Sequence, residues 1–92
     1  MVGVALASGD SVADQVRAHC LERYVAPARK RGDLAVGIRA GDVHTELGFA
    51  QRLPAVCAAL GSDRFESLAR VRRVAIEGPL NGSSTVFVYR LL

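Results

Sequence analysis

Several residue types are scarce in this sequence, and each scarcity counts against a class of protein. There is no tryptophan, aromatic residues make up 5% of the chain, and Lys30 is its one lysine. Two cysteines are too few for the disulfide framework of a small secreted protein, and with two histidines at no paired short spacing they do not make a zinc site. No apolar run approaches the roughly 20 residues that a membrane-spanning helix needs.

The composition is that of one folded domain. The chain has 92 residues, of which 50% are hydrophobic, and this is enough for a single core. We expect a domain over residues 11–92, preceded by a flexible tail over residues 1–10. Residues 1–7 carry no Lys or Arg before their short apolar run, so they do not resemble a secretory signal, and we expect a cytoplasmic protein. Cys20 and Cys57 are expected to be reduced core thiols, with a disulfide between them left open.

The net charge of +3 is modest, and its distribution is more informative than its size. Arginine suits planar, bidentate contacts with phosphates and base edges. The acids fall near expected helix starts, where the helix dipole favours them, at Asp10, Asp14, Asp42, Asp63 and Glu66. The basic residues gather elsewhere, in Arg29, Lys30 and Arg31 and in Arg70, Arg72 and Arg73.

A helix is predicted to open the domain. Ser11 is a good N-cap with Asp14 three residues later, and apolar residues then recur every four positions along one face as far as Tyr24. Pro27 disfavours continuation of the helix. Residues 29–33 are therefore predicted to form an exposed basic loop, which is either simply solvated or in contact with phosphates.

Two further helices joined by a turn are predicted in the middle of the chain. A short strand over residues 34–38 leads into a helix over residues 40–47, and Gly48 suits the left-handed position that ends it. Residues 49–52 form the turn, and Pro54 suits the first turn of the next helix, which runs to about Leu60. Its buried residues are expected to be Leu53, Val56, Cys57 and Leu60, and the exposed positions of the turn and helix to be Gln51, Arg52, Ala55, Ala58 and Ala59.

The chain is predicted to end in a short helical segment and a hairpin. Residues 63–69 form the segment, with Phe65 and Leu68 inward. The apolar period then changes to two around Val74 and Ile76. Residues 78–84 contain Asn-Gly, a strong turn signal, and residues 85–91 are rich in β-branched and aromatic side chains. The predicted class is therefore α+β.

This order of elements resembles the winged helix-turn-helix family over residues 11–92, and the resemblance is centred on residues 38–60. The family has a three-helix core and a C-terminal β-hairpin, the wing. It places one helix in the DNA major groove and the wing against the backbone or minor groove. The resemblance implies double-stranded DNA as the partner, a recognition helix at residues 53–60 and a wing at residues 78–84. Its departures are His44 at a place where a small residue is usual, a longer turn, and Pro54.

The resemblance extends more narrowly to small modules of restriction or phage-derived systems. It implies a regulator of transcription or the targeting module of a DNA-modifying partner protein, and a homodimer is a possible assembly. No cofactor is implied.

The residues expected to contact DNA are small or polar. Arg52 suits guanine, Gln51 suits adenine, and Ala55 permits close approach to a thymine methyl. Short polar side chains in the wing suit phosphate oxygens, although an ordinary hairpin turn needs no ligand. Adjacent strand residues point to opposite faces, so one of Arg72 and Arg73 is expected to reach DNA. The full set is Gln51, Arg52, Ala55, Arg64, Arg72, Arg73, Asn81, Ser83 and Ser84.

No catalytic or metal site is predicted. His19 and Cys20 are adjacent in a helix and do not face each other. His44 and Cys57 have no orienting group or oxyanion site in the sequence. We therefore expect a binding protein rather than an enzyme.

The alternative function is a protein-interaction module of the same fold, which would dimerise or dock on a partner through its exposed, alanine-rich face. The position of the arginines separates the two functions. DNA binding is expected to place Arg52, Arg64 and one of Arg72 or Arg73 on one face, whereas scattered arginines favour the interaction module.

Overall fold

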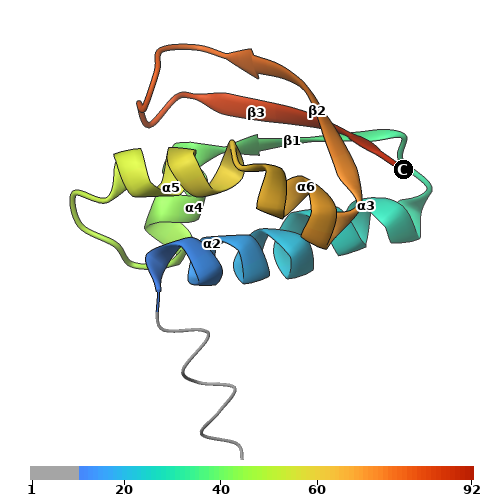
Figure 1. Cartoon of the computed structure of the whole chain (residues 1–92), viewed down its shortest axis with the longest axis horizontal. Coiled ribbons are helices and arrows are strands. Elements are labelled where there is room, and N and C mark those ends of the chain that lie inside the picture. The colour runs from blue at the N-terminus through green and yellow to red at the C-terminus, as the bar shows by residue number, and fades with distance from the viewer. Residues whose placement is uncertain (1–10) are drawn as a thin grey trace, which may run out of the picture.

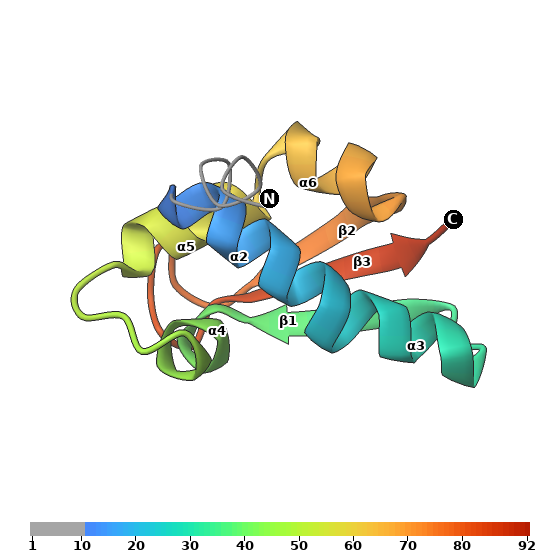
Figure 2. The same cartoon turned by 90° about the horizontal axis from the view of Figure 1, so that it is seen from below.

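The computed structural model describes residues 11–92, and the expected tail over residues 1–10 lies outside them. The elements in chain order are α2 (Val12–Cys20), the π-helical turn η1 (Leu21–Val25), α3 (Ala26–Arg31), β1 (Ala35–Arg39), α4 (Ala40–Glu46), α5 (Leu53–Leu60), α6 (Asp63–Ala69), β2 (Val71–Glu77) and β3 (Val86–Leu91). The helices lie on one face of the sheet and leave the other face bare (Figure 1; Figure 2). The α+β class is confirmed, and within the described residues no helix is long and apolar enough to cross a membrane.

The sheet has three antiparallel strands in the order β1–β3–β2. Phe87 and Tyr89 of the central strand turn their side chains toward the helices and are buried, with Ile38 of β1 directly opposite Phe87. Strand alternation then places Val88 and Arg90 on the bare face. The prediction of a strand after the basic segment is confirmed, shifted by one residue.

The core joins the sheet to α5 and α6 through aromatic contacts. The rings of Phe65 and Tyr89 meet edge to face with their centroids 5.2 Å apart, and the Tyr89 hydroxyl donates to the Leu60 carbonyl. Two predictions about this region are wrong. Ala59 was expected on the surface but is buried, because α5 packs against both α2 and α4. Leu68 was expected inward but is 49% exposed, because the inward positions of α6 are taken by Phe65 and Ala69.

The start of the first helix is confirmed, and its predicted end is wrong. The Ser11 hydroxyl accepts from the Asp14 amide at 3.0 Å, so Ser11 is the N-cap. The helix does not stop before Pro27 but passes through the wider turn η1 and continues to Arg31. Proline lacks an N–H and is tolerated in the first turn of a helix, and the change from η1 to α3 places Pro27 in such a position. The residues predicted as a basic loop are therefore mainly helical.

Arg29 closes the structure where α3 meets the end of the chain. Its guanidinium donates to the carbonyls of Ala69 at 2.6 Å, Arg70 at 2.7 Å and Leu92 at 2.9 Å. The first two are carbonyls at the end of α6, which lack partners within that helix. The side chain is thus a bridge between α3, α6 and the residue after β3 rather than a free phosphate ligand.

Replacement of Arg29 by Ala should lower the free energy of unfolding by about 1–2 kcal/mol, because three charge-assisted hydrogen bonds are lost at a partly exposed site. Lys30→Ala is the matched control, since Lys30 is the neighbouring cation on the same helix and makes no hydrogen bond or ion pair within residues 11–92; its effect should stay within about 0.5 kcal/mol. Urea unfolding followed by circular dichroism measures both. Equal effects of the two substitutions would contradict the bridging role.

Candidate nucleic-acid interface

The loop between β2 and β3, residues 78–85, is bonded to the start of α4. The amide of Ala40 donates to the Thr85 carbonyl at 2.8 Å, and the amide of Gly41 donates to the Ser83 carbonyl at 2.9 Å. The first amides of a helix have no partner within it, and Arg39 at the N-cap provides no side-chain bond. The loop carbonyls therefore cap α4, and the cap fixes the loop in place.

Gly41 is required by this contact. A Cβ atom at residue 41 would overlap the Ser83 carbonyl oxygen and lie 3.0 Å from Nη1 of Arg39. The backbone of the loop can approach α4 this closely only because no side chain stands between them.

The β2–β3 loop is ordered internally as well. The Thr85 hydroxyl donates to the Pro79 carbonyl and accepts from the Gly82 amide at 3.0 Å. Asn81 adopts a left-handed conformation with φ 55°, which asparagine tolerates well. The side chains of Asn81, Ser83 and Ser84 are exposed.

The turn between α4 and α5 is organised by His44. Gly48 has φ 69° at the end of α4, as predicted. The His44 carbonyl accepts from the Phe49 amide at 3.0 Å, and its Nε2 accepts from the Arg52 amide at 3.0 Å. An imidazole that accepts at Nε2 carries its proton on Nδ1. Its ring also meets Phe49 edge to face. The His44 side chain therefore holds the turn between α4 and α5 in shape.

Arg52 lies at the N-cap of α5 and is exposed. Among residues 11–92 its guanidinium has no acidic partner. Gln51 precedes it, exposed and left-handed at φ 55°. The helix itself exposes Pro54 and Ala58, with Ala55 half-buried, so its outer face is small and uncharged.

Five of the predicted contact residues lie on two segments at the same end of the molecule. The β2–β3 loop and the turn before α5 both lie at the left of Figure 1, and they carry Gln51, Arg52, Asn81, Ser83 and Ser84. Arg39, which the sequence reasoning missed, joins this end at the corner between β1 and α4 and pairs with Asp42 at 2.9 Å. Its signal was its place directly after a strand and before a helix.

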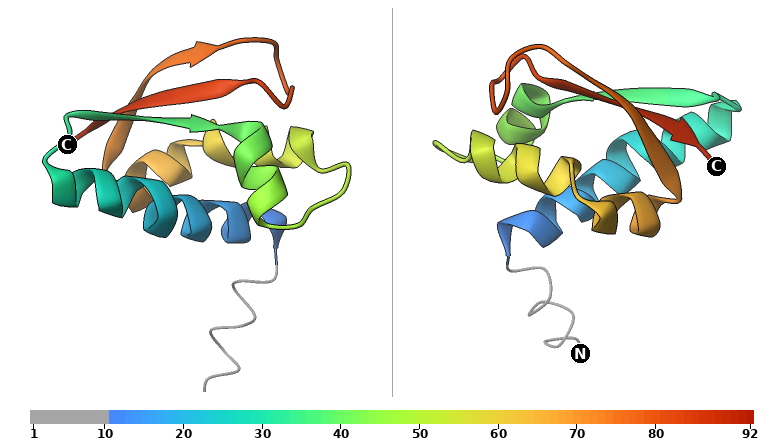
Figure 3. Two further views of the ribbon diagram at one scale, coloured as in Figure 1. Left: turned by 180° about the vertical axis from the view of Figure 1, so that it is seen from behind. Right: turned by 45° about the horizontal axis from the view of Figure 1, so that its top comes forward.

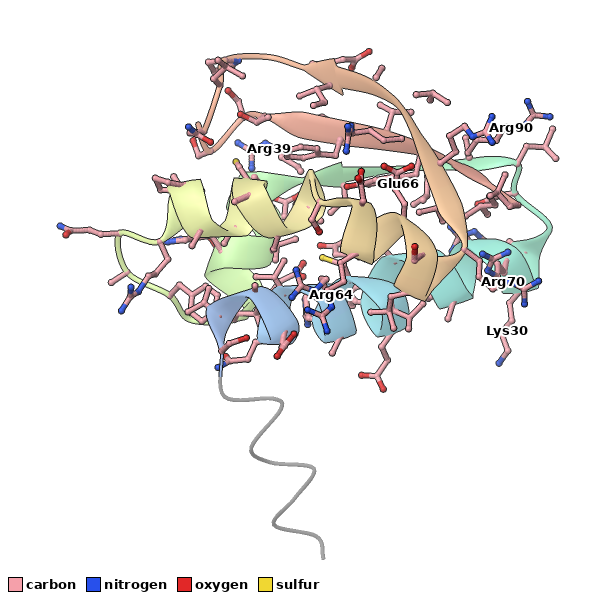
Figure 4. All side chains as sticks on the ribbon, in the orientation of Figure 1. Lys30, Arg39, Arg64, Glu66, Arg70 and Arg90 are labelled. Atoms are coloured by element: carbon pink, nitrogen blue, oxygen red, sulfur yellow. The ribbon has the colours of Figure 1, made fainter. Side chains whose placement is uncertain are left out.

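The other predicted arginines lie elsewhere. Arg64 projects from α6 beside α2 (Figure 4), where it contributes, after Arg17, to the lowered pKa of Asp14. Arg72 lies opposite Arg90 on the bare face of the sheet. Arg73 is the next residue of β2, and its side chain points to the opposite face, toward the helices, as strand alternation predicts. Its guanidinium donates to the Gly61 carbonyl at 2.6 Å and to Glu66 at 3.4 Å.

Arg52, Arg64 and Arg72 or Arg73 therefore do not share one face, and this scatter is the arrangement that favours the protein-interaction module. The exposed cations Lys30, Arg70 and Arg90 gather instead at the end opposite the β2–β3 loop (Figure 4). Sequence reasoning could not group them, because they come from α3, from the turn after α6 and from β3.

The histidines and cysteines make structural contacts. His19 Nε2 and the Tyr24 hydroxyl each lie 2.7 Å from an oxygen of Glu46, which ties the first helix to the end of α4. Burial raises the pKa of Glu46, but the bonds from His19 and Tyr24 outweigh it and leave this pKa below its usual value. Cys20 and Cys57 are free and buried, as predicted. Burial and the nearby charge of Glu46 raise the pKa of Cys20 to about 12.

Gly41→Ala should lower the free energy of unfolding by about 1–3 kcal/mol, because the new methyl group overlaps the loop backbone. The substitution should also speed hydrogen exchange of the amide of residue 41, which donates to the Ser83 carbonyl. Gly37→Ala is the matched control, since a Cβ atom there meets only Val86 Cγ1 at an ordinary 3.6 Å, and it should change stability by less than about 0.5 kcal/mol. Equal loss in both variants would mean that the loop is not fixed by this contact.

Cys20 should be unreactive toward a thiol reagent in the folded protein. With a pKa of about 12, its thiolate fraction at pH 8 is about 10⁻⁴, and the side chain is inaccessible. The Cys57→Ala variant isolates Cys20, and labelling followed with and without denaturant measures its reactivity. Fast labelling of the folded variant would show that Cys20 is an accessible, activated thiol.

Comparison with known proteins does not assign a family. No protein-family model matches the chain, and neither a curated protein nor a solved structure matches it. The contacts described above are therefore the basis on which a function is proposed.

Proposed function

We propose that this chain is a winged-helix protein that binds double-stranded DNA through the end formed by the β2–β3 loop and the start of α5. The observation that carries the proposal is the position of Arg52. It stands at the first turn of a helix with a small outer face, free of acidic partners within the described residues, on the same end as a fixed polar loop.

The strand order β1–β3–β2, with helices before and after β1, agrees with the winged-helix order of elements. In that arrangement the N-terminal part of the recognition helix meets base edges. Arg52 would then donate two hydrogen bonds to a guanine, while Pro54 and Ala58 let the helix approach the groove floor. The exposed Asn81, Ser83 and Ser84 would lie over the backbone as the wing.

The charge of this end predicts weak, sparingly salt-dependent binding. Arg52 and Arg39 are its cations, and Asp42 offsets part of Arg39. Each phosphate neutralised contributes about 0.9 to the salt slope, so a slope of about 1–2 is expected rather than the value near 10 of a strongly basic repressor. A biological role as a regulator or as the targeting module of a DNA-modifying partner fits such a module, because a dimer or a partner would add affinity.

A protein-interaction module is the second candidate. Two observations favour it: Arg64, Arg72 and Arg73 are scattered, as expected of an interaction module, and the outer face of α5 is apolar and uncharged. A helix face of proline and alanine packs against protein as readily as it enters a groove.

Arg52→Ala should weaken binding to a preferred duplex by about 1–3 kcal/mol and binding to random duplex much less. Arg64→Ala is the matched control, since Arg64 is an exposed arginine near the start of a helix but lies on the α2 side; it should leave both affinities unchanged. A preferred duplex would first be selected from a random pool. Fluorescence anisotropy over a salt series from about 50 mM then measures the affinity of the unchanged protein and of both variants for the preferred and the random duplex.

Absence of binding to any duplex at about 50 mM salt by the folded protein would rule out DNA and leave the interaction module. Equal weakening on both duplexes would make Arg52 a backbone contact and move the recognition helix elsewhere. An effect of Arg64→Ala as large as that of Arg52→Ala would place the DNA across the α2–α6 side instead.

A further inference from the structure

The outer edge of β1 carries backbone groups without strand partners. The amide of Leu91 donates to the Leu34 carbonyl at 2.9 Å, and the amide of Ala40 donates to the Thr85 carbonyl at 2.8 Å. Along an antiparallel strand, the backbone groups of successive residues alternately bond to the partner strand and point away from it. The even-numbered residues from Leu34 to Ala40 therefore direct their N–H and C=O groups toward β3. The N–H and C=O groups of Ala35, Gly37 and Arg39 therefore point away from the sheet.

Nothing in this strand blocks the addition of another. Edge strands are commonly protected by proline, lysine, a bulge or a covering element. β1 contains no proline or lysine, its pairing with β3 is regular, and it exposes Ala35 and Gly37. Its one charged residue, Arg39, lies at the end of the strand and is paired with Asp42. The irregular pairing of the sheet is confined to the other edge, between Arg73 and Ala75 of β2.

A groove runs between this edge and the end of the first helix. It has a volume of about 370 Å³ and is lined by Arg23, Tyr24, Pro27, Arg31 and Asp33 together with residues 35–37 of β1. The left view of Figure 3 shows β1 above η1 and α3, with the turn at residues 32–34 closing one end. An open strand edge beside a helix is the arrangement in which extended peptides bind as an added strand.

The charge of the groove selects the occupant. The Arg23 guanidinium lies 5.4 Å from the centre of the Tyr24 ring and has no ion pair within the described residues, because the nearby Glu46 is bonded to His19 and Tyr24. The Arg31 guanidinium forms an ion pair with the Asp33 carboxylate at 2.9 Å. The residues that line the groove therefore carry a net charge of +1, from Arg23 and Arg31 against Asp33. A second copy of the chain would bring the arginines of both grooves together, which disfavours self-association there.

We propose that β1 and this groove bind an extended acidic peptide segment of a partner protein as a fourth strand of the sheet. The backbone of the peptide bonds to Ala35, Gly37 and Arg39, and an acidic side chain pairs with Arg23. The site shares with the proposed DNA-binding end only Arg39, whose backbone and not whose guanidinium would bind the peptide, and it does not depend on DNA binding.

A capped seven-residue peptide of alternating valine and glutamate is the probe, titrated into the ¹⁵N-labelled chain and followed by NMR. It should slow amide exchange at Ala35, Gly37 and Arg39. Gly37→Pro removes one outward N–H without loss of a sheet bond, and Arg23→Glu reverses the charge; each should weaken binding by about tenfold. Ile76→Pro and Arg72→Glu are the matched controls. The N–H of Ile76 points outward from the opposite edge because its partner Phe87 faces β1, and Arg72 lies outside the groove.

Two more peptides keep the test decisive if Gly37→Pro fails to fold. One peptide is N-methylated at the odd-numbered residues and the other at the even-numbered residues. The two should differ in affinity, because only one set of amides bonds to β1. The proposal is overturned if the β1 amides gain no protection, if a peptide with lysine in place of glutamate binds equally well, if the two methylated peptides bind alike, or if the controls weaken binding as much as Arg23→Glu.

Discussion

The hydrogen bonds from the first two amides of α4 to the β2–β3 loop fix the position of that loop relative to the helices. α4 follows β1 without a linker, and β1 pairs with β3, so the carbonyls of Ser83 and Thr85 meet the helix start as soon as the sheet forms. The same helix carries His44, which positions the turn that ends at Arg52. A cap of two bonds thus aligns a hairpin with a helix far from it in sequence. The proposed DNA-binding end exists as a unit because of that cap.

The distribution of charge separates the two ends of the molecule. Arg52 stands almost alone near the β2–β3 loop, whereas Lys30, Arg70 and Arg90 lie together at the other end (Figure 4). If DNA is the ligand, base-edge and main-chain contacts must contribute more to affinity than counterion release does. The positive groove beside β1 then gives the chain a separate route to a protein partner. A small module that recognises a site with one surface and a partner with another suits a targeting role.

Local signals predicted the elements, and tertiary contacts decided the site. The Ser11 cap, the left-handed Gly48 and Pro54 at a helix start were all correct, because each depends only on neighbouring backbone geometry. Arg73 shows the limit. Alternation correctly separated it from Arg72, but no local rule reveals that Glu66 and the Gly61 carbonyl lie within reach of its guanidinium. Whether any predicted residue contacts DNA remains a prediction of the proposed function.

The π-helical turn η1 holds one residue more than an α-helical turn that rotates through nearly the same angle. The helix after it therefore keeps the face set by α2, and Arg29 meets the three carbonyls that it bridges. A single residue deleted within residues 21–25 would return the turn to α-helical spacing and leave this register nearly unchanged. The deletion would, however, place Pro27 in a helix interior, where its ring clashes with the carbonyl four residues earlier. The extra residue thus lets a helix that contains a proline run on to Arg31 without a break.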